Sequence, residues 1–465
     1  MNMINVRRLT VMTFLGAGML SGISAQVSPL QVDTLKETKI PAQWDLQSCI
    51  DYAKEQNITI RKNRITAAST QIDVKTAKAA LLPSLSFSTS QLVVTRLSHE
   101  TSSRVSGSVI ISSTSKTTYI GNYCLNASWT LYNGNKRLKT IQQEKLNNQV
   151  AELDVATSEN NIQESIAQVY IQILYAAESV KVNESTLQVS IAQRDRGQEL
   201  LNAGSIAKSD FAQLEAQVST DRYQLVTAQA TLEDYKLQLK QLLELDGENE
   251  MNIYLPALSD ENVLAPLPTK KDVYIRALSL RPEIEASKLN VEASELGIGI
   301  AKSSYLPTIS LSAGIGTNHT SGSDFTFGEQ VKNGWNNSIG LSVSVPIFNN
   351  RQTKSAVQKA KLQYETSMLS LLDEQKTLYK TIEGLWLDAN SAQQRYAAAN
   401  EKLKSTQISY ELISEQFNLG MKNTIELLTE KNNLLQAQQE QLQAKYMAIL
   451  NMQLLKFYQG DQLAI

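Results

Sequence analysis

Two regions of the chain alternate apolar and small polar residues with a period of two. In the first region the apolar positions fall at alternate residues over 85–87 and 119–131, and in the second over 309–315 and 339–347. Serine, threonine, asparagine and glycine occupy most of the positions between them. This is the pattern of a strand with one apolar and one polar face. Each region therefore predicts a pair of β-strands.

Between and after these regions, residues that break helices are nearly absent. Residues 135–246 and 351–459 contain no proline and only two glycines each. Such uninterrupted segments predict two long helical hairpins, which must bend near Gly204 and Gly420. In the returning arm of each hairpin the apolar residues step by seven, as in coiled coils. One core position of the first heptad series is charged, namely Asp221.

The expected helix lengths favour coiled-coil packing over an ordinary amphipathic bundle. A helix over residues 135–200 would span about 100 Å at 1.5 Å per residue. Helices over 58–81 and 205–245, placed end to end, would reach the same length. The sequence therefore predicts a rod about 100 Å tall in which two shorter helices lie alongside one long helix.

The two halves of the chain are a tandem repeat. Three pairs of short segments recur in the same order, the first pair 224 residues apart (Pro83 to Pro307) and the last two 216 apart (Gly204 to Gly420). The pairs are Leu82-Pro83 with Leu306-Pro307, Leu131-Tyr132-Asn133-Gly134 with Ile347-Phe348-Asn349-Asn350, and Ala203-Gly204 with Leu419-Gly420. Chance matches would not keep this order and spacing, so each repeat is expected to hold a helix, two strands and a helical hairpin.

We expect five segments along the chain: a signal peptide over 1–25, a first repeat over 26–245, an equatorial linker over 246–271, a second repeat over 272–459 and a C-terminal tail over 460–465. The signal peptide is predicted from Arg7 and Arg8, the apolar run that follows them to Leu20, and the small residues before Gln26. Elsewhere no apolar run approaches 18 residues, so no transmembrane helix is expected in the mature chain. An exported protein can form disulfides, but Cys49 and Cys124 fall in different predicted elements, and we expect two unpaired thiols.

Composition and charge exclude several classes of protein. Only 20 Gly and 9 Pro among 465 residues are too few for a conventional sandwich or propeller. The 44 Lys and Arg residues nearly balance the 46 Asp and Glu residues, so no broad field indicates a nucleic-acid partner.

The sequence shows no arrangement of catalytic, cofactor-binding or metal-binding residues. His99 and His319 lie in segments 98–116 and 318–337, which are rich in small polar residues and read as exposed outer loops. Neither histidine has a cysteine or a second histidine at ligand spacing. We therefore expect no enzyme activity, cofactor or bound metal.

The predicted strands suit a membrane barrel. Their polar face is almost uncharged, and their apolar face carries Tyr119, Tyr123 and Trp129, as expected for an aromatic belt around a barrel with a wet interior. Four strands cannot close a barrel, and an open sheet edge is not tolerated in hydrocarbon. Several chains must then share one barrel.

The sequence resembles the TolC family of outer-membrane efflux proteins over nearly the whole mature chain. The resemblance rests on the duplicated Leu-Pro, strand-exit and hairpin-turn motifs given above. It implies an α+β membrane protein in which a homotrimer forms a 12-stranded barrel that continues into a long α-helical coiled-coil periplasmic tunnel. It also implies an equatorial layer built from residues 26–43, the region of Pro256, Pro266 and Pro268, and the tail. Pro83, Pro307 and Pro346 would mark the junctions between helices and strands.

The function implied by this resemblance is that of a passive exit duct in the outer membrane of a Gram-negative bacterium. Substrates of a tripartite efflux or type I secretion system would arrive from an inner-membrane pump of the RND, ABC or MFS type through a periplasmic adaptor. A barrel-anchored trimeric adhesin or structural coiled coil is the alternative. Adhesins generally carry their barrel at one end of the chain, whereas here the strands recur within both halves.

The resemblance also implies a gate beyond the hairpin glycines. Residues at the family's gate positions are Asp210, Phe417, Lys422 and Glu426. A second acidic residue of the family pattern is replaced by Thr429, so a double ring of carboxylates is not expected. In a trimer, three copies of Glu426 around one axis would raise the carboxylate pKa or favour a bound cation.

A simpler interpretation of the two acidic residues remains open. Asp210 and Glu426 are also placed where a helix starts, and there a carboxylate complements the helix dipole. The glycines Gly204 and Gly420 are expected to make the turns, because a bend between helices often requires positive φ. By resemblance, Ser205 and Met421 at the tips would contact the adaptor.

Overall fold

The computed structural model describes residues 41–95, 102–106, 109–113, 117–246, 251–256, 263–323 and 325–463. The predicted signal peptide, most of the N-terminal stretch 26–43 and His99 lie outside the described residues. The helices and strands of the described residues belong to one compact unit, Gln43–Ile465. None of the helices in the described part of the chain is long and apolar enough to span a bilayer.

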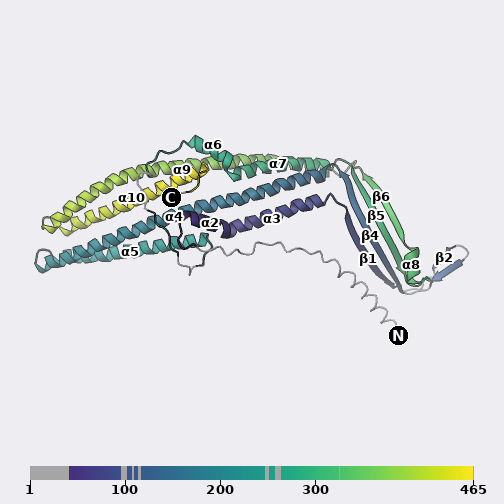
Figure 1. Ribbon diagram of the computed structural model, residues 1–465, viewed down its shortest axis with the longest axis horizontal. Coiled ribbons are helices and arrows are strands. Elements are labelled where there is room, and N and C mark those ends of the chain that lie inside the picture. Colours follow the sequence, from purple (N-terminus) through teal and green to yellow (C-terminus); the bar gives the residue numbers. More distant parts are fainter. Residues whose placement is uncertain are drawn as a thin grey trace, which may run out of the picture. The chain divides into compact units, whose positions relative to one another are not determined.

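The chain folds as two copies of one unit (Figure 1). The first copy contains α2 (Leu46–Gln56), α3 (Ile58–Ala79), β1 (Ser84–Thr95), β2 (Ser102–Ser106), β3 (Val109–Ser113), β4 (Thr117–Asn133), α4 (Lys136–Asn202) and α5 (Lys208–Leu242). The second contains α6 (Lys270–Leu280), α7 (Pro282–Ser303), β5 (Thr308–Thr320), α8 (Phe327–Asn333), β6 (Asn336–Ser344), α9 (Gln352–Asn418) and α10 (Thr424–Tyr458).

Helix lengths confirm the predicted tandem repeat. Helices α4 and α9 have 67 residues each, α5 and α10 have 35 each, and α3 and α7 have 22 each. Their starting residues differ by 224 before the strands (Ile58 to Pro282) and by 216 after them (Lys136 to Gln352), as in the sequence motifs. The positive φ of Asn135, 61°, recurs at Arg351, 65°.

The structure differs from the sequence-based expectation in three places. Segment 98–116 is not simply an exposed loop, because strands β2 and β3 pair there as an antiparallel hairpin. Segment 318–337 contains the end of β5, helix α8 and the start of β6, and the placement of His319 in an outer loop is wrong because it lies in β5. Each repeat also begins with two helices rather than one. They are broken at Asn57, which caps α3, and at Arg281, which precedes Pro282 at the start of α7.

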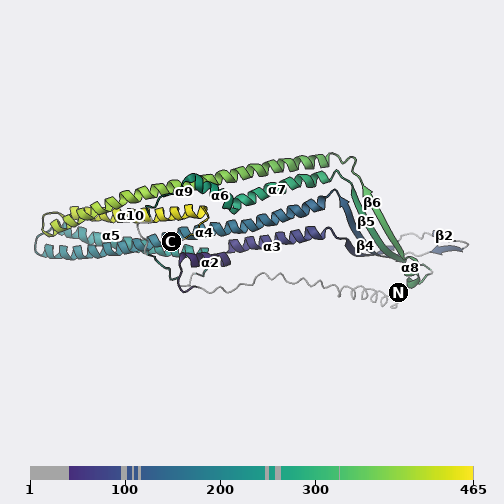
Figure 2. The same cartoon turned by 45° about the horizontal axis from the view of Figure 1, so that its top comes forward.

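The predicted stacking of two shorter helices beside a long one is confirmed. Helix α4 packs against α3 and α5, and the two views show α3 and α5 following each other along it (Figures 1 and 2). At their junction Asn57 Nδ2 donates to the carbonyl of Leu242 at 3.0 Å, and the amide of Ile58 donates to Glu244 Oε1 at 3.2 Å. These bonds satisfy polar groups that the helix ends would otherwise leave unpaired.

The largest apolar core lies where α2, α4 and α10 meet the linker. Trp44 and Tyr170 are both 1% exposed there, and Trp44 forms a parallel bridge with Ile253 of the linker. Cys49 is fully buried in this core, and burial raises the pKa of its thiol to about 12. Cys49 and Cys124 are both free, as predicted.

Four strands form an antiparallel sheet in the order β1-β4-β5-β6. One row across the sheet is Leu85, Ala127, Ala313 and Ile339, and the next is Ser86, Asn126, Gly314 and Ser338, so apolar and polar rows alternate between the two faces. The apolar face is uncovered, with Leu85 70% and Ile339 84% exposed. A bulge at Leu131 shifts the register, which places Tyr132 opposite Ile309.

Candidate functional site

The turns of the two hairpins lie together at the end of the helices away from the sheet (Figure 2). Gly204 has φ 73° and Gly420 has φ 72°. After each glycine, the next amide donates back to the helix, from Ser205 to the Leu200 carbonyl and from Met421 to the Gln416 carbonyl, both at 2.8 Å. This is the Schellman arrangement that ends helices at a left-handed residue.

We expect Gly204→Ala and Gly420→Ala each to destabilise the protein by about 1 kcal/mol, because an L-residue is strained at positive φ. Steric clash is not the cause, since a Cβ at either position would meet nothing within 4 Å. Gly384 within α9 provides the matched control: it too is open to a Cβ but does not have positive φ. Gly384→Ala should stabilise by about 0.5–1 kcal/mol. Urea unfolding followed by circular dichroism measures all three.

Two of the four predicted gate residues contact each other. Lys422 and Glu426 form an ion pair four residues apart at the start of α10, with side chains 35% and 39% exposed. Asn423 caps the same helix by accepting from the Glu426 amide at 2.9 Å, and its Nδ2 donates to Glu426 Oε1 at 3.0 Å. The charge of Glu426 is therefore balanced by Lys422 of the same hairpin. Glu426 also lies in the first turn of the helix, where the helix dipole stabilises a carboxylate.

The other two predicted gate residues are not joined to this pair. Asp210 lies in the first turn of α5, partly buried, and in the described chain its side chain forms no hydrogen bond or ion pair with the other three. Phe417 is 4% exposed in the last turn of α9. One chain thus brings Lys422 and Glu426 together and leaves Asp210 on the opposite hairpin.

The hairpin tip of the second repeat carries uncovered apolar side chains. Leu419 is 74% exposed, Met421 65% and Ile425 61%, while Ser205 on the first tip is also exposed. Such a patch at the end of a rod is typical of a contact surface for another protein.

Proline residues stand at the junctions with the sheet. Pro83 directly precedes β1, Pro307 directly precedes β5, and Pro346 follows β6 before α9 begins. Next to the first junction, Trp129 Nε1 donates to the carbonyl of Leu81 at 2.8 Å, which ties β4 to the end of α3.

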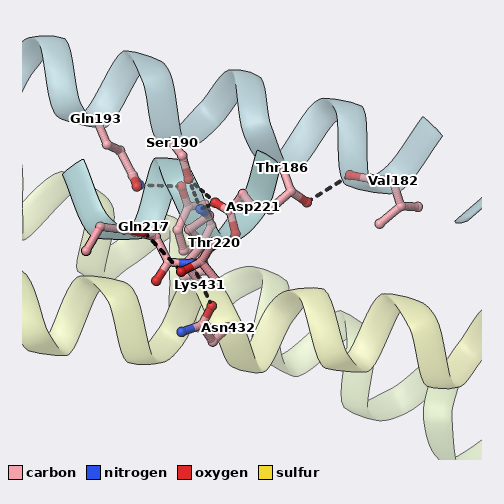
Figure 3. A network of polar contacts seen from close by, with 11 residues as sticks. Val182, Thr186, Ser190, Gln193, Gln217, Thr220, Asp221, Lys431 and Asn432 are labelled. Atoms are coloured by element: carbon pink, nitrogen blue, oxygen red, sulfur yellow. Dashed lines mark hydrogen bonds and ion pairs between the residues drawn. The ribbon is translucent and has the colours of Figure 1, made fainter. Parts of the chain in front are cut away.

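A buried charge cluster lies between the hairpins and was not predicted from the sequence (Figure 3). Lys431 of α10 forms an ion pair with Asp221 of α5, and Ser190 of α4 contacts both. Their exposed fractions are 4%, 1% and 2%. The heptad could have revealed it, since Asp221 stands at a core position, and Lys431 lies three residues after the core residue Leu428.

A second buried cation, Arg281, ties the junction of α6 and α7 to its neighbours. Its guanidinium donates to Glu164 Oε1 of α4 at 2.5 Å and lies 3.7 Å from the ring centre of Tyr458 at the end of α10. Burial raises the pKa of Tyr458 to about 12, and the charge of Glu164 adds to this. Asn57 and Leu242 make the corresponding junction in the first repeat, so the duplicated contact uses different chemistry in each copy.

No cluster of metal-ligating side chains occurs in the described segments. His319 packs between aromatic rings, 5.9 Å from the ring centre of Tyr123 and 5.0 Å from that of Phe327. A side chain on its neighbour Gly121 would collide with the imidazole, 2.1 Å from Cε1. The imidazole therefore occupies the space that a side chain at position 121 would need on that face of the sheet.

Comparison with known proteins agrees with the duplicated fold. The family model described as outer membrane efflux protein matches residues 49–244 and 273–460, one match for each repeat. The chain belongs to this family. Among curated members, it is 24% identical to outer membrane efflux protein BepC of Brucella suis over 290 residues, and 23% identical to outer membrane protein TolC of Escherichia coli over 324 residues. These matches cover 62% and 68% of this chain but only 60% and 64% of the two relatives.

The efflux-protein fold is shown by solved structures as well. The crystal structure of CusC matches with a TM-score of 0.76 at 18% sequence identity, over 92% of this chain and 96% of that one. The TolC-like fold predicted from the sequence is thereby confirmed.

Proposed function

We propose that this efflux-family chain is one subunit of a homotrimeric exit duct in the outer membrane of a Gram-negative bacterium. In this proposal, substrates arrive from an inner-membrane pump of the RND, ABC or MFS type through a periplasmic adaptor and leave passively through one lumen. BepC and TolC are both named as outer membrane proteins, which supports the location. Family membership supports the duct over an adhesin.

The observation that carries this proposal is the uncovered sheet. Among the described residues its apolar face has no covering layer, as shown by Phe87 at 66% and Leu341 at 64% exposed, while the opposite face is lined by serine, asparagine and glycine. In water such an exposed apolar face would promote aggregation, but in a bilayer it forms the outer wall of a barrel with a polar interior.

The sheet edges support closure by other copies. Strands β1 and β6 are the two edges, and three antiparallel pairings separate them, so they run in opposite directions. An edge β6 of one copy can therefore pair antiparallel with β1 of the next. Three copies give twelve strands, an even number within the range of outer-membrane barrels. Closure also removes the unpaired edges that lipid does not tolerate.

Purified full-length protein in planar bilayers tests the proposal directly. We expect stable pores and, in electrophoresis, a trimer that dissociates on heating. A pump-dependent drug-sensitivity assay in a deletion strain tests the same duct in the cell. Absence of pores together with loss of surface adhesion on deletion would support the adhesin alternative instead.

In the proposed duct, the ion pair of Lys422 and Glu426 contributes to the closed periplasmic end. We expect Lys422→Ala and Glu426→Ala each to raise the conductance of the resting pore. Arg196→Ala is a control, because Arg196 forms a pair with Glu199 that is likewise local, within α4, and is more exposed. Conductance equal to wild type in both tip variants would show that the pair serves only the helix end.

A further inference from the structure

The buried cluster of Ser190, Asp221 and Lys431 joins the two hairpins of one chain. Ser190 and Asp221 belong to α4 and α5, the first hairpin, and Lys431 belongs to α10 of the second. Lys431 Nζ donates to the Asp221 carboxylate and to the Ser190 hydroxyl, and the Ser190 hydroxyl donates to the same carboxylate. Figure 3 shows the three side chains converging between the helices.

A neighbouring amide completes the cluster. Gln217 Nε2 donates to Asp221 Oδ1 at 2.9 Å and lies 3.4 Å from Asn432 Oδ1 on α10. Both carboxylate oxygens of Asp221 are therefore bonded, and the serine hydroxyl both donates and accepts. A serine beside a lysine also occurs as a nucleophile and base in hydrolases, but side chains at most 4% exposed leave no access for a substrate.

Because both charges are buried, Asp221 and Lys431 must either stay paired or separate completely. A buried ion pair is compensated only while both partners stay in place, and removing one leaves an unpaired charge in a medium of low dielectric constant. A slip of one helical turn between the hairpins would also set Lys431 against apolar residues of α5 such as Val218 or Leu225. Buried polar pairs fix the register of coiled coils in this way.

We propose that Asp221 and Lys431, positioned by Ser190, form a buried latch that holds the second hairpin against the first and must break when the hairpins separate. The latch rests on the proposed function, because separation of the hairpins is taken as the opening of the duct. It differs from the pair of Lys422 and Glu426, which is partly exposed and local to the start of α10. The latch connects the hairpins by charge at a level beyond the turns.

Charge variants of the purified full-length trimer test the latch. In planar bilayers we expect Lys431→Met and Asp221→Asn to raise the resting conductance several-fold, and Ser190→Ala, which removes only a hydroxyl, to raise it less. The swapped pair Asp221→Lys with Lys431→Asp should return the conductance to within about twofold of wild type. Lys402→Met is the matched control, because Lys402 forms an exposed pair with Glu440 at 2.8 Å inside the second hairpin, and we expect no change.

A merely structural role would lower the temperature at which the trimer dissociates without changing its conductance, and that result would overturn the latch. Wild-type conductance in Ser190→Ala and Asp221→Asn would overturn it even if Lys431→Met fails to fold. A swapped pair as leaky as the single variants would do so as well. These outcomes are distinct from failure of the duct itself, in which the wild-type trimer forms no pore.

Discussion

Replacing Ile339 of β6 by lysine is expected to abolish assembly of the protein in the membrane. Ile339 is 84% exposed near the middle of β6, on the apolar face that the proposed barrel turns toward lipid. A lysine at the bilayer midplane of a barrel costs about 2–4 kcal/mol. A homotrimer carries this cost three times. The measurement is the yield of heat-dissociable trimer after the protein is refolded into lipid vesicles.

The neighbouring residue supplies the control, because adjacent side chains of a strand point to opposite faces. Ser338 pairs with Gly314 in the polar row of the sheet, and a lysine there would extend into the water-filled interior. Ser338→Lys should therefore give nearly the wild-type yield of trimer, with altered ion selectivity. Equal loss of trimer in both variants would contradict the assignment of the faces, whereas equal tolerance would argue against a lipid-facing sheet.

The strands and hairpins were predictable because their signals are local. Alternation around Leu125 or Leu341 reports the two faces of a strand without knowledge of its partners. Gly204 and Gly420 reveal the turns because only the backbone conformation at those residues demands glycine. Each short motif also occurs in both repeats, so two matches support every assignment.

What the sequence did not reveal depends on contacts between distant residues. The heptads place Asp221 and Lys431 at core positions of different hairpins, but Lys431 and Ser190 are 241 positions apart, and the heptads do not show that both lie against Asp221. The breaks at Asn57 and Arg281 were missed for a related reason. Each is fixed by a contact to the far end of the same repeat, at Leu242 or Tyr458, rather than by a local breaker alone.

We expect Arg281→Met to destabilise the folded protein by about 2–3 kcal/mol. Loss of one partner of a fully buried ion pair usually costs about 3–5 kcal/mol, but the Glu164 carboxylate that remains is 26% exposed and therefore partly solvated. Arg281 is 6% exposed, and its loss would leave Glu164 without the cation that compensates it. It would also remove the guanidinium from the ring of Tyr458, where the end of α10 meets the start of α7. Urea unfolding in detergent micelles, followed by circular dichroism, measures the change.

Two further variants separate the charge of Arg281 from its shape. Arg281→Lys keeps the cation but loses the planar group that stacks on Tyr458 and bonds to Glu164, so an intermediate loss is expected. Arg196→Met makes the same chemical change at an exposed pair, where Arg196 and Glu199 are 49% and 69% exposed, and should cost less than about 1 kcal/mol. If Arg281→Met were no more destabilising than Arg196→Met, the junction of α6, α7 and α10 would be held by apolar packing alone.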